Sequence, residues 1–534
     1  MWYTRKGIKG SNPFVSARYY SGEAQMKYVT TPIYYPNGDP HIGHAYTTIL
    51  GDVLKRVANM NGEDTFYTTG VDEHGQKIQA AIEKSGLSEQ EFLDNKADVF
   101  KSLFDSLDIQ YDFFVRTTAD KHIKVVQEFL QKIYESGYIV KKKYSGLYCE
   151  GCEMFKRESD LDEHGNCPDH QKKPIVVEEE NYFFRLEPFR DWLVEHIKNN
   201  PEWIQPKYFA TEILNMLKEP LEDLCISRPV SRVKMGVPLP FDDKYVTYIW
   251  FDALVNYVSS IYEKPNKDQL WANSVHLMGK DIIKPHCIYW PIMLKAMGLE
   301  PVHKVLVHGF LTGESGIKMS KSIGNVVDPV KVINTVGTDA LRMFMSTNVS
   351  DRDIAVSERN ITEFYQLMAN NIGNLHMRSC KLLEKYKSNV VPDAKLTDED
   401  SQLLTQISNS LSSALKSVTN FAEISALSNA LLQACSEVNS YVSRKEPWSM
   451  AKRLPETQDE LDSCLYTLMD SLRIIAIALY PIAPNTAKKI LDTLQIDQAD
   501  ITVVNVVPAK LQAGVQIKEA SILFPKLAVD STEK

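Results

Sequence analysis

The chain has 534 residues, of which 44% are hydrophobic, so it is long enough for several domains with real cores. Its formal net charge of -9 excludes a uniformly basic nucleic-acid binder, although a local basic face would suffice for phosphate contacts. The most apolar run, residues 474–479, is far shorter than the ~20 residues of a membrane-spanning helix, so we expect no membrane partner.

The first 22 residues contain Arg5, Lys6, Lys9 and Arg18 but no acidic residue. This composition is typical of a transit peptide that directs a protein to the mitochondrial matrix. We therefore predict a transit peptide over residues 1–25 and a folded protein that begins near Met26. The alternative is a basic tail without a targeting role.

A strand, a turn and a helix are predicted next. Residues 27–31 alternate as a strand does, residues 37–40 carry strong turn chemistry, and residues 42–60 have helical periodicity. His41 and His44, three residues apart at the helix start, project from one face, where the helix N-terminus favours phosphate. Gly43 allows adenine to approach the backbone. Alternatively, the two histidines merely cap the helix.

A second predicted strand, residues 65–69, leads to Asp72. Further strands are predicted at residues 245–250, 275–278 and 304–308. The fold class is therefore α/β, with a Rossmann-type sheet whose ligands collect at the carboxyl ends of its strands. Its first half covers residues 26–134 and its second half residues 235–345, with a connective insertion at 135–234.

The insertion contains Cys149-x2-Cys152 followed by Cys167-x2-His170. Two close pairs joined by a short loop suit tetrahedral Zn²⁺, and four protein ligands leave no position for an activated water. We predict a structural zinc knuckle. The other cysteines are isolated, and we expect them to be packing residues.

A lysine-containing loop follows the last predicted strand and comprises Lys318, Met319, Ser320, Lys321 and Ser322. Its two ammonium groups would neutralise charge that develops on the β- and γ-phosphates of ATP when a carboxylate attacks the α-phosphate. Mg²⁺ would accompany the nucleotide. Alone, the lysines could be a solvated loop. After the histidine motif, they predict an ATP site that activates a carboxylate by adenylylation.

The remainder is predicted to be helical, with amphipathic stretches near 361–387, 399–420, 424–444 and 459–493. We expect a connecting segment at 346–360, an α-helical bundle at 361–505 and a C-terminal tail at 506–534. Asn374 and Arg378 share one helix face, and Trp448 lies in a turn. An amide, a guanidinium and an indole can bind splayed RNA bases; a buried Trp with a surface Asn and Arg is the alternative.

The ordered pair of ATP-site motifs is the signature of class I aminoacyl-tRNA synthetases, which the sequence resembles. Residues 32–38 (Pro-Ile-Tyr-Tyr-Pro-Asn-Gly), 69–75 (Thr-Gly-Val-Asp-Glu-His-Gly) and 248–257 look like methionyl-tRNA synthetase. So do Gly279-Lys280-Asp281-Ile282 and residues 286–291. The resemblance covers residues 27 to about 490. It implies formation of methionyl-adenylate from methionine and ATP, and transfer of methionine to the 3′ end of tRNA(Met). Together with the predicted transit peptide, this predicts a role in mitochondrial translation.

The resemblance also implies roles for individual residues. Asp72 would hold the methionine ammonium group, and the pocket would be lined by Ile33, Tyr35, Trp250, Ala253, Tyr257 and His286. Aromatic walls suit a thioether, although Trp250 and Tyr257 alone would more often be core residues. Asn374, Arg378 and Trp448 would read the CAU anticodon.

Three positions depart from the family pattern, and the first of them concerns the local wall of the methionine pocket. Pro285 stands where an aromatic residue is usual, Met235 where a Trp is common, and Arg352-Asp353 where Gly-Asp is usual. We expect no further tRNA-binding domain after residue 534; because such a domain often dimerises these enzymes, we also expect a monomer.

Three other functions are weighed against this prediction. A synthetase for Leu, Ile or Val would carry a large editing insertion, for which the length leaves no room. A nucleotidyltransferase with the same His-x-Gly-His motif would not need the helical half. A catalytically silent tRNA-binding protein is disfavoured because the ATP-site residues are intact.

Overall fold

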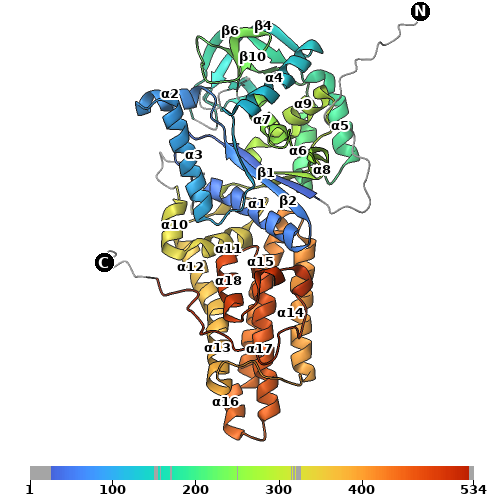
Figure 1. Ribbon diagram of the computed structural model, residues 1–534. Coiled ribbons are helices and arrows are strands. Elements are labelled where there is room, and N and C mark those ends of the chain that lie inside the picture. Colours follow the sequence, from blue (N-terminus) through green and yellow to red (C-terminus); the bar gives the residue numbers. More distant parts are fainter. Residues whose placement is uncertain are drawn as a thin grey trace, which may run out of the picture.

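The computed structural model describes residues 26–149, 154–156, 158–168, 171–248, 250–313, 316, 319 and 326–527. An α/β part with two small sheets above it occupies one end of the elongated molecule, and a helical bundle occupies the other (Figure 1). The predicted transit peptide lies outside the described residues. Within the described ranges, none of the helices combines the length and apolar character that crossing a bilayer requires.

Six parallel strands form the main sheet, in the order β3-β2-β1-β12-β13-β7. They are β1 (Met26–Tyr34), β2 (Asp64–Val71), β3 (Phe113–Arg116), β7 (Ile204–Gln205), β12 (Ser274–Gly279) and β13 (Lys304–His308). The predicted strands at 27–31, 65–69, 275–278 and 304–308 are confirmed. The strand order reverses between β1 and β12, and ligands of such sheets bind in the crevice at this switch point.

Helices cover both faces of the main sheet. Successive strand residues point to opposite sides, and apolar residues on each side pack against a different set of helices. Val29 and Leu277 join a core with α1 (Ile42–Met60), α3 (Glu89–Ser106) and α11 (Thr338–Asn348). Their neighbours Tyr28 and Met278 join a second core with α4 (Asp120–Glu135), α7 (Trp250–Ser259) and α9 (Trp290–Met297). The remaining helices of this part are α2 (Gln76–Ser85), α8 (Lys267–Ala272) and α10 (Pro329–Val336).

Two small antiparallel sheets lie above the main sheet (Figure 1). One consists of β4 (Ile139–Cys149), β5 (Met154–Lys156), β6 (Ile175–Phe184) and β8 (Leu224–Cys225); the other consists of β9 (Ser227–Pro229), β10 (Pro238–Leu239) and β11 (Asp242–Thr247). The prediction that residues 245–250 return to the main sheet is therefore wrong, since β11 pairs with β9 and β10. Alternation reveals a half-buried strand but not which sheet it joins.

The predicted insertion at 135–234 also contributes a strand to the main sheet. β7, between α5 (Arg190–Asn199) and α6 (Lys207–Met216), pairs with β13 at the sheet edge. A strand of two residues is too short to leave a periodic pattern.

The bundle confirms the predicted helical half. α12 (Glu358–Met368), a π-helical turn (Ala369–Gly373) and α13 (Asn374–Lys387) are contiguous; α14 (Asp398–Ser417), α15 (Phe421–Lys445), α16 (Pro447–Met450), α17 (Gln458–Leu479) and α18 (Pro484–Thr493) follow. The stretch predicted at 459–493 is two helices. Pro481 and Pro484 lack the N–H groups that would continue the first helix.

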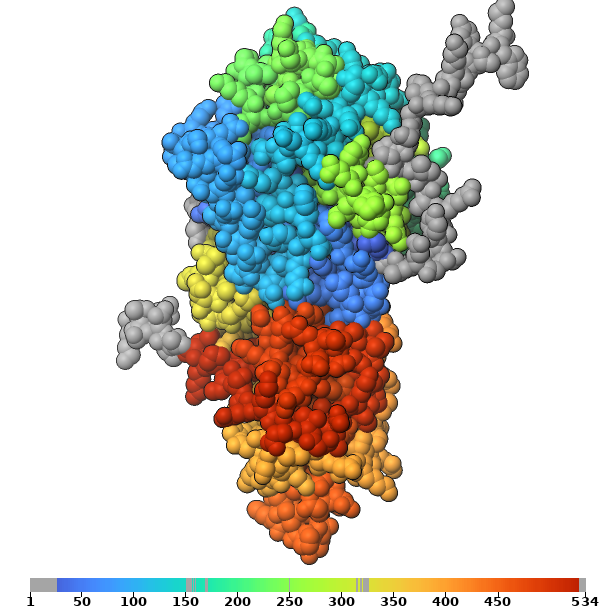
Figure 2. Space-filling model, viewed as in Figure 1, coloured from blue at the N-terminus to red at the C-terminus, as the bar shows by residue number. Residues whose placement is uncertain are grey.

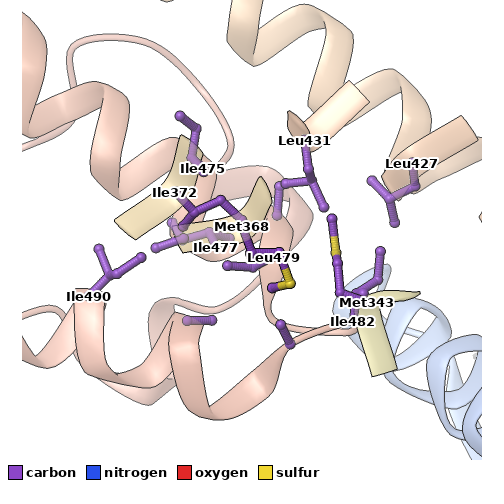
Figure 3. Packing of buried hydrophobic residues seen from close by; sticks show 14 of the residues in the cluster. Met343, Met368, Ile372, Leu427, Leu431, Ile475, Ile477, Leu479, Ile482 and Ile490 are labelled. Atoms are coloured by element: carbon purple, nitrogen blue, oxygen red, sulfur yellow. The ribbon is translucent and has the colours of Figure 1, made fainter. Parts of the chain in front are cut away.

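The hydrophobic core continues from the α/β part into the bundle. Met343 of α11 lies near Leu427 and Leu431 of α15 and beside Ile482 (Figure 3). At the same junction, the fully buried Arg342 places Nη2 2.7 Å from Oδ2 of Asp52 on α1. Arg342 Nε also donates to the Ile482 carbonyl at 2.9 Å. In the space-filling view, the red surface of the last helices abuts the blue surface of the α/β part (Figure 2).

Residues 506–527, predicted as a tail beyond the bundle, pack against it instead. Val506, Leu511, Ile517 and Leu523 are buried in the same core as the bundle helices. Their apolar residues are too sparse and irregular to produce a helical or strand period.

Candidate functional site

The two histidines of the first motif are fixed by backbone hydrogen bonds at the start of α1. His41 Nδ1 accepts from the Gly43 amide at 3.1 Å, and His44 Nδ1 accepts from the His41 amide at 3.0 Å. Since Nδ1 is the acceptor in both, a neutral ring carries its proton on Nε2. The rings are stacked, with centroids 3.7 Å apart. His41 therefore does cap the helix, and the cap itself orients two Nε2–H donors.

His308, which the sequence analysis did not select, connects α1 to the end of β13. Its Nδ1 donates to the Gly309 carbonyl at 2.8 Å, so its Nε2 accepts from the Thr47 hydroxyl, also at 2.8 Å. Burial lowers the pKa of His308, which favours the neutral ring that this pattern requires. Its position at the carboxyl end of a strand was the available signal.

The lysine loop is described only in part. Met319 is half-buried against the main core, whereas Lys318, Ser320, Lys321 and Ser322 lie outside the described residues. At the base of the loop, β14 (Leu311–Thr312) pairs with β15 (Ile354–Ala355).

The Arg352-Asp353 departure retains its carboxylate at this base. Asp353 Oδ1 accepts from the Phe310 amide at 3.0 Å and lies 2.6 Å from Lys280 Nζ. Gly309 admits this approach, because a Cβ there would lie 2.1 Å from the Arg352 carbonyl oxygen.

Three of the predicted methionine-pocket residues are brought together by α7 and the π-helical turn Pro285–Tyr289. Tyr257 Oη lies 2.7 Å from His286 Nε2, and the Trp250 and His286 rings meet edge-on with centroids 6.2 Å apart. Ala253 is on α7 as well and is buried. Pro285 is the first residue of the turn that carries His286.

The other pocket candidates lie at strand ends. Ile33 and Tyr35 are at the end of β1, and Asp72 follows β2. Tyr35 packs against a cluster that contains Met235, so this departure contributes an apolar neighbour. Asp72 is buried, and its Oδ1 accepts from the Thr117 hydroxyl and the His74 amide, both at 3.3 Å.

Asp252 is the partner of His74, and no sequence motif predicts this pair. His74 Nδ1 lies 2.7 Å from Asp252 Oδ2, and this contact ties the Asp72 loop to α7. Burial alone would lower the pKa of His74, but the hydrogen bond and charge of Asp252 outweigh it, and the pKa is raised. The two residues are 178 positions apart, so no local pattern marks the pair.

Two of the four predicted zinc ligands are described. The Cys149 and Cys167 side chains are buried, as structural thiolate ligands are, and Asp162 Oδ1 accepts from the His164 and Asn166 amides in the turn before Cys167. Cys152 and His170 lie outside the described residues. Among the residues that the structure does describe, no group of three or more His, Cys, Asp or Glu side chains could hold a metal ion.

Two of the three predicted RNA-binding residues are in contact on the bundle. The Arg378 guanidinium lies 5.3 Å from the centre of the Trp448 ring, which is a cation–π contact. Asn374 is exposed one turn before Arg378 on α13. Trp448 is half-buried in α16, directly after Glu446 (φ 46°) and Pro447.

Comparisons with known proteins cover nearly the whole chain. The family model described as "tRNA synthetases class I (M)" matches residues 27–174 and 165–380, and "Anticodon binding domain of methionyl tRNA ligase" matches residues 391–534. A methionine–tRNA ligase of Clostridium tetani is 38% identical over 513 residues, which are 94% of this chain and 79% of the relative.

Two further proteins are similar to comparable extents. The chloroplastic/mitochondrial methionine–tRNA ligase of Arabidopsis thaliana is 35% identical over 522 residues, covering 95% of this chain and 84% of that protein. The Mycobacterium tuberculosis methionyl-tRNA synthetase, solved with methionyl-adenylate, superposes with a TM-score of 0.88 at 32% identity. This match covers 94% of this chain and 100% of the other.

Proposed function

The chain belongs to the class I methionyl-tRNA synthetase family and is a methionine–tRNA ligase, and we propose that it charges tRNA(Met) for mitochondrial translation. The observation that carries the catalytic part of the proposal is the pair of Nε2–H donors of His41 and His44, at the start of α1. The His44 ring lies 4.6 Å from the ring of Tyr34, the last residue of β1, and such sheets bind ligands where the strand order reverses beside β1.

In the proposed reaction, the methionine carboxylate attacks the α-phosphate of ATP and pyrophosphate leaves. His41 and His44 donate from Nε2 to phosphate oxygens, next to the positive end of the α1 dipole, and Gly43 accommodates adenine. Lys318 and Lys321, with Met319, Ser320 and Ser322 completing the loop, neutralise the β- and γ-phosphates. Mg²⁺ would enter the site with ATP and would neutralise part of the phosphate charge.

Amino-acid-dependent exchange of pyrophosphate into ATP tests this function. Methionine is expected to stimulate exchange, and tRNA(Met) to accept methionine in the complete reaction. Exchange stimulated by leucine, isoleucine or valine and not by methionine would contradict the substrate. Absence of exchange with every amino acid would instead favour a silent tRNA-binding protein.

We propose that methionine binds between the strand ends and α7. Asp72 pairs with its ammonium group, while Trp250, Ala253, Tyr257 and His286, together with Ile33 and Tyr35, surround its side chain. Burial lowers the pKa of His286 to about 4, and its Nδ1 donates to the Ile282 carbonyl at 2.8 Å. The neutral ring therefore accepts a hydrogen bond from the Tyr257 hydroxyl at Nε2.

Replacing Tyr257 by phenylalanine should raise the KM for methionine about tenfold, because the buried His286 Nε2 loses its donor at a cost of ~1–3 kcal/mol. The KM for tRNA should not change. Exchange kinetics at varied methionine concentration measure the first value and aminoacylation the second. An unchanged methionine KM would contradict this role.

The same histidine gives a pH dependence with a defined sign. The unfolded chain takes up this proton near pH 6.5, but the folded pocket does so only near 4. The free energy of unfolding therefore decreases as the pH falls from about 6.5 towards 4. Replacing His286 by glutamine should flatten this part of the pH profile of thermal unfolding.

We propose that Asn374, Arg378 and Trp448 read the CAU anticodon. Base–aromatic stacking contributes ~1–3 kcal/mol per base. Replacing Trp448 by alanine should therefore raise the KM for tRNA(Met) at least tenfold while leaving methionine-dependent exchange unchanged. Equal loss of both activities would indicate a folding defect rather than lost base contact.

We propose that Cys149, Cys152, Cys167 and His170 hold a structural Zn²⁺, which when bound would cross-link the loop of the small sheet. The buried thiol side chains of Cys149 and Cys167 support this donor set. Metal analysis of the purified protein should find one Zn²⁺ per chain, and the double substitution Cys149→Ser, Cys167→Ser should abolish it. Zinc content well below stoichiometric would reject the site.

The mitochondrial assignment is supported by the basic composition of residues 1–25 and by one chloroplastic/mitochondrial relative. A reporter fused to residues 1–30 should enter mitochondria; a cytosolic reporter would contradict the targeting role. We also propose that the enzyme is a monomer, which sedimentation of the purified chain tests directly.

A further inference from the structure

A segment near the C-terminus lies alongside α13, the helix that carries Asn374 and Arg378. We call residues 514–525 the strap. At its start, the Ile517 amide donates to the Asn389 carbonyl at 2.8 Å, just beyond the end of α13. At its other end, the hydroxyl of Tyr365, a residue of α12, donates to the Pro525 carbonyl at 2.5 Å. The strap therefore runs antiparallel to α13 and α12 with both ends fixed (Figure 1).

Aromatic packing also holds the strap near its Pro525 end. The Phe524 ring meets Tyr365 edge-on, with centroids 5.7 Å apart. It also fills the space beside Gly373, where a Cβ would lie 3.0 Å from Phe524 Cδ2. This packing leaves the neighbouring Ile522 with 65% of its surface exposed, although it is a large apolar residue.

Between the strap and the helix lies a hollow of about 520 Å³. Its helix side is formed by Asn370, Gly373, Asn374 and Met377, and its strap side includes Ile522 and Phe524. The hollow thus combines two exposed amide side chains with apolar side chains. Amides can read the edge of an unstacked base while apolar groups contact its face.

The surroundings favour a nucleic acid over a protein as the occupant. α13 carries Arg378, Lys381, Lys385 and Lys387; Lys381 pairs with Glu384 and Lys387 with Asp462 of α17, so the net positive charge of the helix comes from Arg378 and Lys385, in a chain with a net charge of -9. Such a local basic helix attracts phosphates. The hollow is also continuous with the proposed anticodon site, since Asn374 belongs to both.

We infer that the strap forms a second wall of the anticodon site and that Ile522 packs against a nucleoside of the tRNA(Met) anticodon loop. This inference rests on the proposed anticodon-binding role of Asn374, Arg378 and Trp448. It assigns a substrate contact to a segment outside the helices of the bundle.

The experiment compares Ile522→Glu with Val504→Glu in the full chain. Val504 is an equally exposed apolar residue of the same domain, at 70%, but does not line the hollow. Ile522→Glu should raise the KM for tRNA(Met) about tenfold, and Val504→Glu should not. Both variants should retain wild-type methionine-dependent exchange. A minihelix that lacks the anticodon arm should be charged equally by Ile522→Glu and the wild type.

A tRNA KM for Ile522→Glu equal to that of Val504→Glu would overturn the inference, and Ile522 would then suit a protein contact. A higher minihelix KM for Ile522→Glu would overturn it too. Trp448→Ala separates this failure from failure of the anticodon proposal. If Trp448→Ala raises the tRNA KM and Ile522→Glu does not, only the strap inference fails; if Trp448→Ala has no effect, the anticodon assignment fails first.

Discussion

Replacing His44 by alanine is expected to reduce kcat for methionine-dependent exchange by about 10²–10³-fold, the loss typical of removing one donor that stabilises transition-state charge. The reason is that His44 Nε2–H is held in place by the His41 amide, which donates to Nδ1. The KM for methionine should change little, because His44 is not among the residues proposed to line that pocket. Steady-state exchange at varied ATP and methionine measures both quantities.

Two further substitutions separate catalysis from helix capping. Glutamine and glutamate at this position can each accept from the His41 amide and so preserve the capping box, which alanine removes at a cost of ~1 kcal/mol. His44→Gln also keeps a neutral donor, whereas His44→Glu presents an anion to the phosphates. We expect partial activity for His44→Gln and the lowest activity for His44→Glu, although both should unfold at the same temperature. Equal activities of these two variants would show that the residue acts only as a cap.

The parts of the fold that follow from sequence are those with local patterns. The strand at 27–31, the turn and the helix at 42–60 are contiguous, and their apolar periods change clearly from one to the next. In contrast, β7 is two residues long, and residues 245–250 alternate without indicating their partner strand. The local periodicity of apolar residues identifies a helix or a strand, but burial and strand pairing decide which sheet a strand joins.

The same distinction holds for the candidate site, where short motifs are visible in the sequence and contacts between distant residues are not. The histidine motif lies within four residues, and the aromatic run lies within α7, so each is visible as one continuous stretch of sequence. The contacts that hold these groups join distant positions: Thr47 and His308 are 261 residues apart, and His74 and Asp252 are 178 apart. Such pairs arise only when the sheet brings strand ends together, so a single sequence contains no signal for them.

Replacing Asp52 by leucine is expected to destabilise the protein by about 3–5 kcal/mol, the cost of leaving a buried charge without its partner. Asp52 is fully buried on α1 and lies 2.6 Å from Arg56 Nε and 2.7 Å from Arg342 Nη2. Burial alone would raise the pKa of Asp52, but the two guanidinium groups outweigh it, and the pKa is lowered. Its stabilising contribution is thus fully present above the ordinary value near 4 and is lost as the pH falls below that value and through the lowered pKa of Asp52.

The double variant Asp52→Leu, Arg342→Met determines whether the charge or the packing is responsible. It removes both members of the pair, while Arg56 keeps the Asp108 carbonyl at 2.6 Å, so much of the lost stability should return. Asp492→Asn breaks an exposed pair with Lys518 and should cost at most ~1 kcal/mol, which provides the surface reference. Urea unfolding measures the stability of all three variants.

Because α1 also carries His44, and Arg342 contacts the Ile482 carbonyl of the bundle, the single variant Asp52→Leu should lose exchange activity in step with stability. The double variant should regain both. A double variant as unstable as Asp52→Leu alone would mean that the side-chain packing of Asp52, not its charge, holds the ATP-site helix to the bundle.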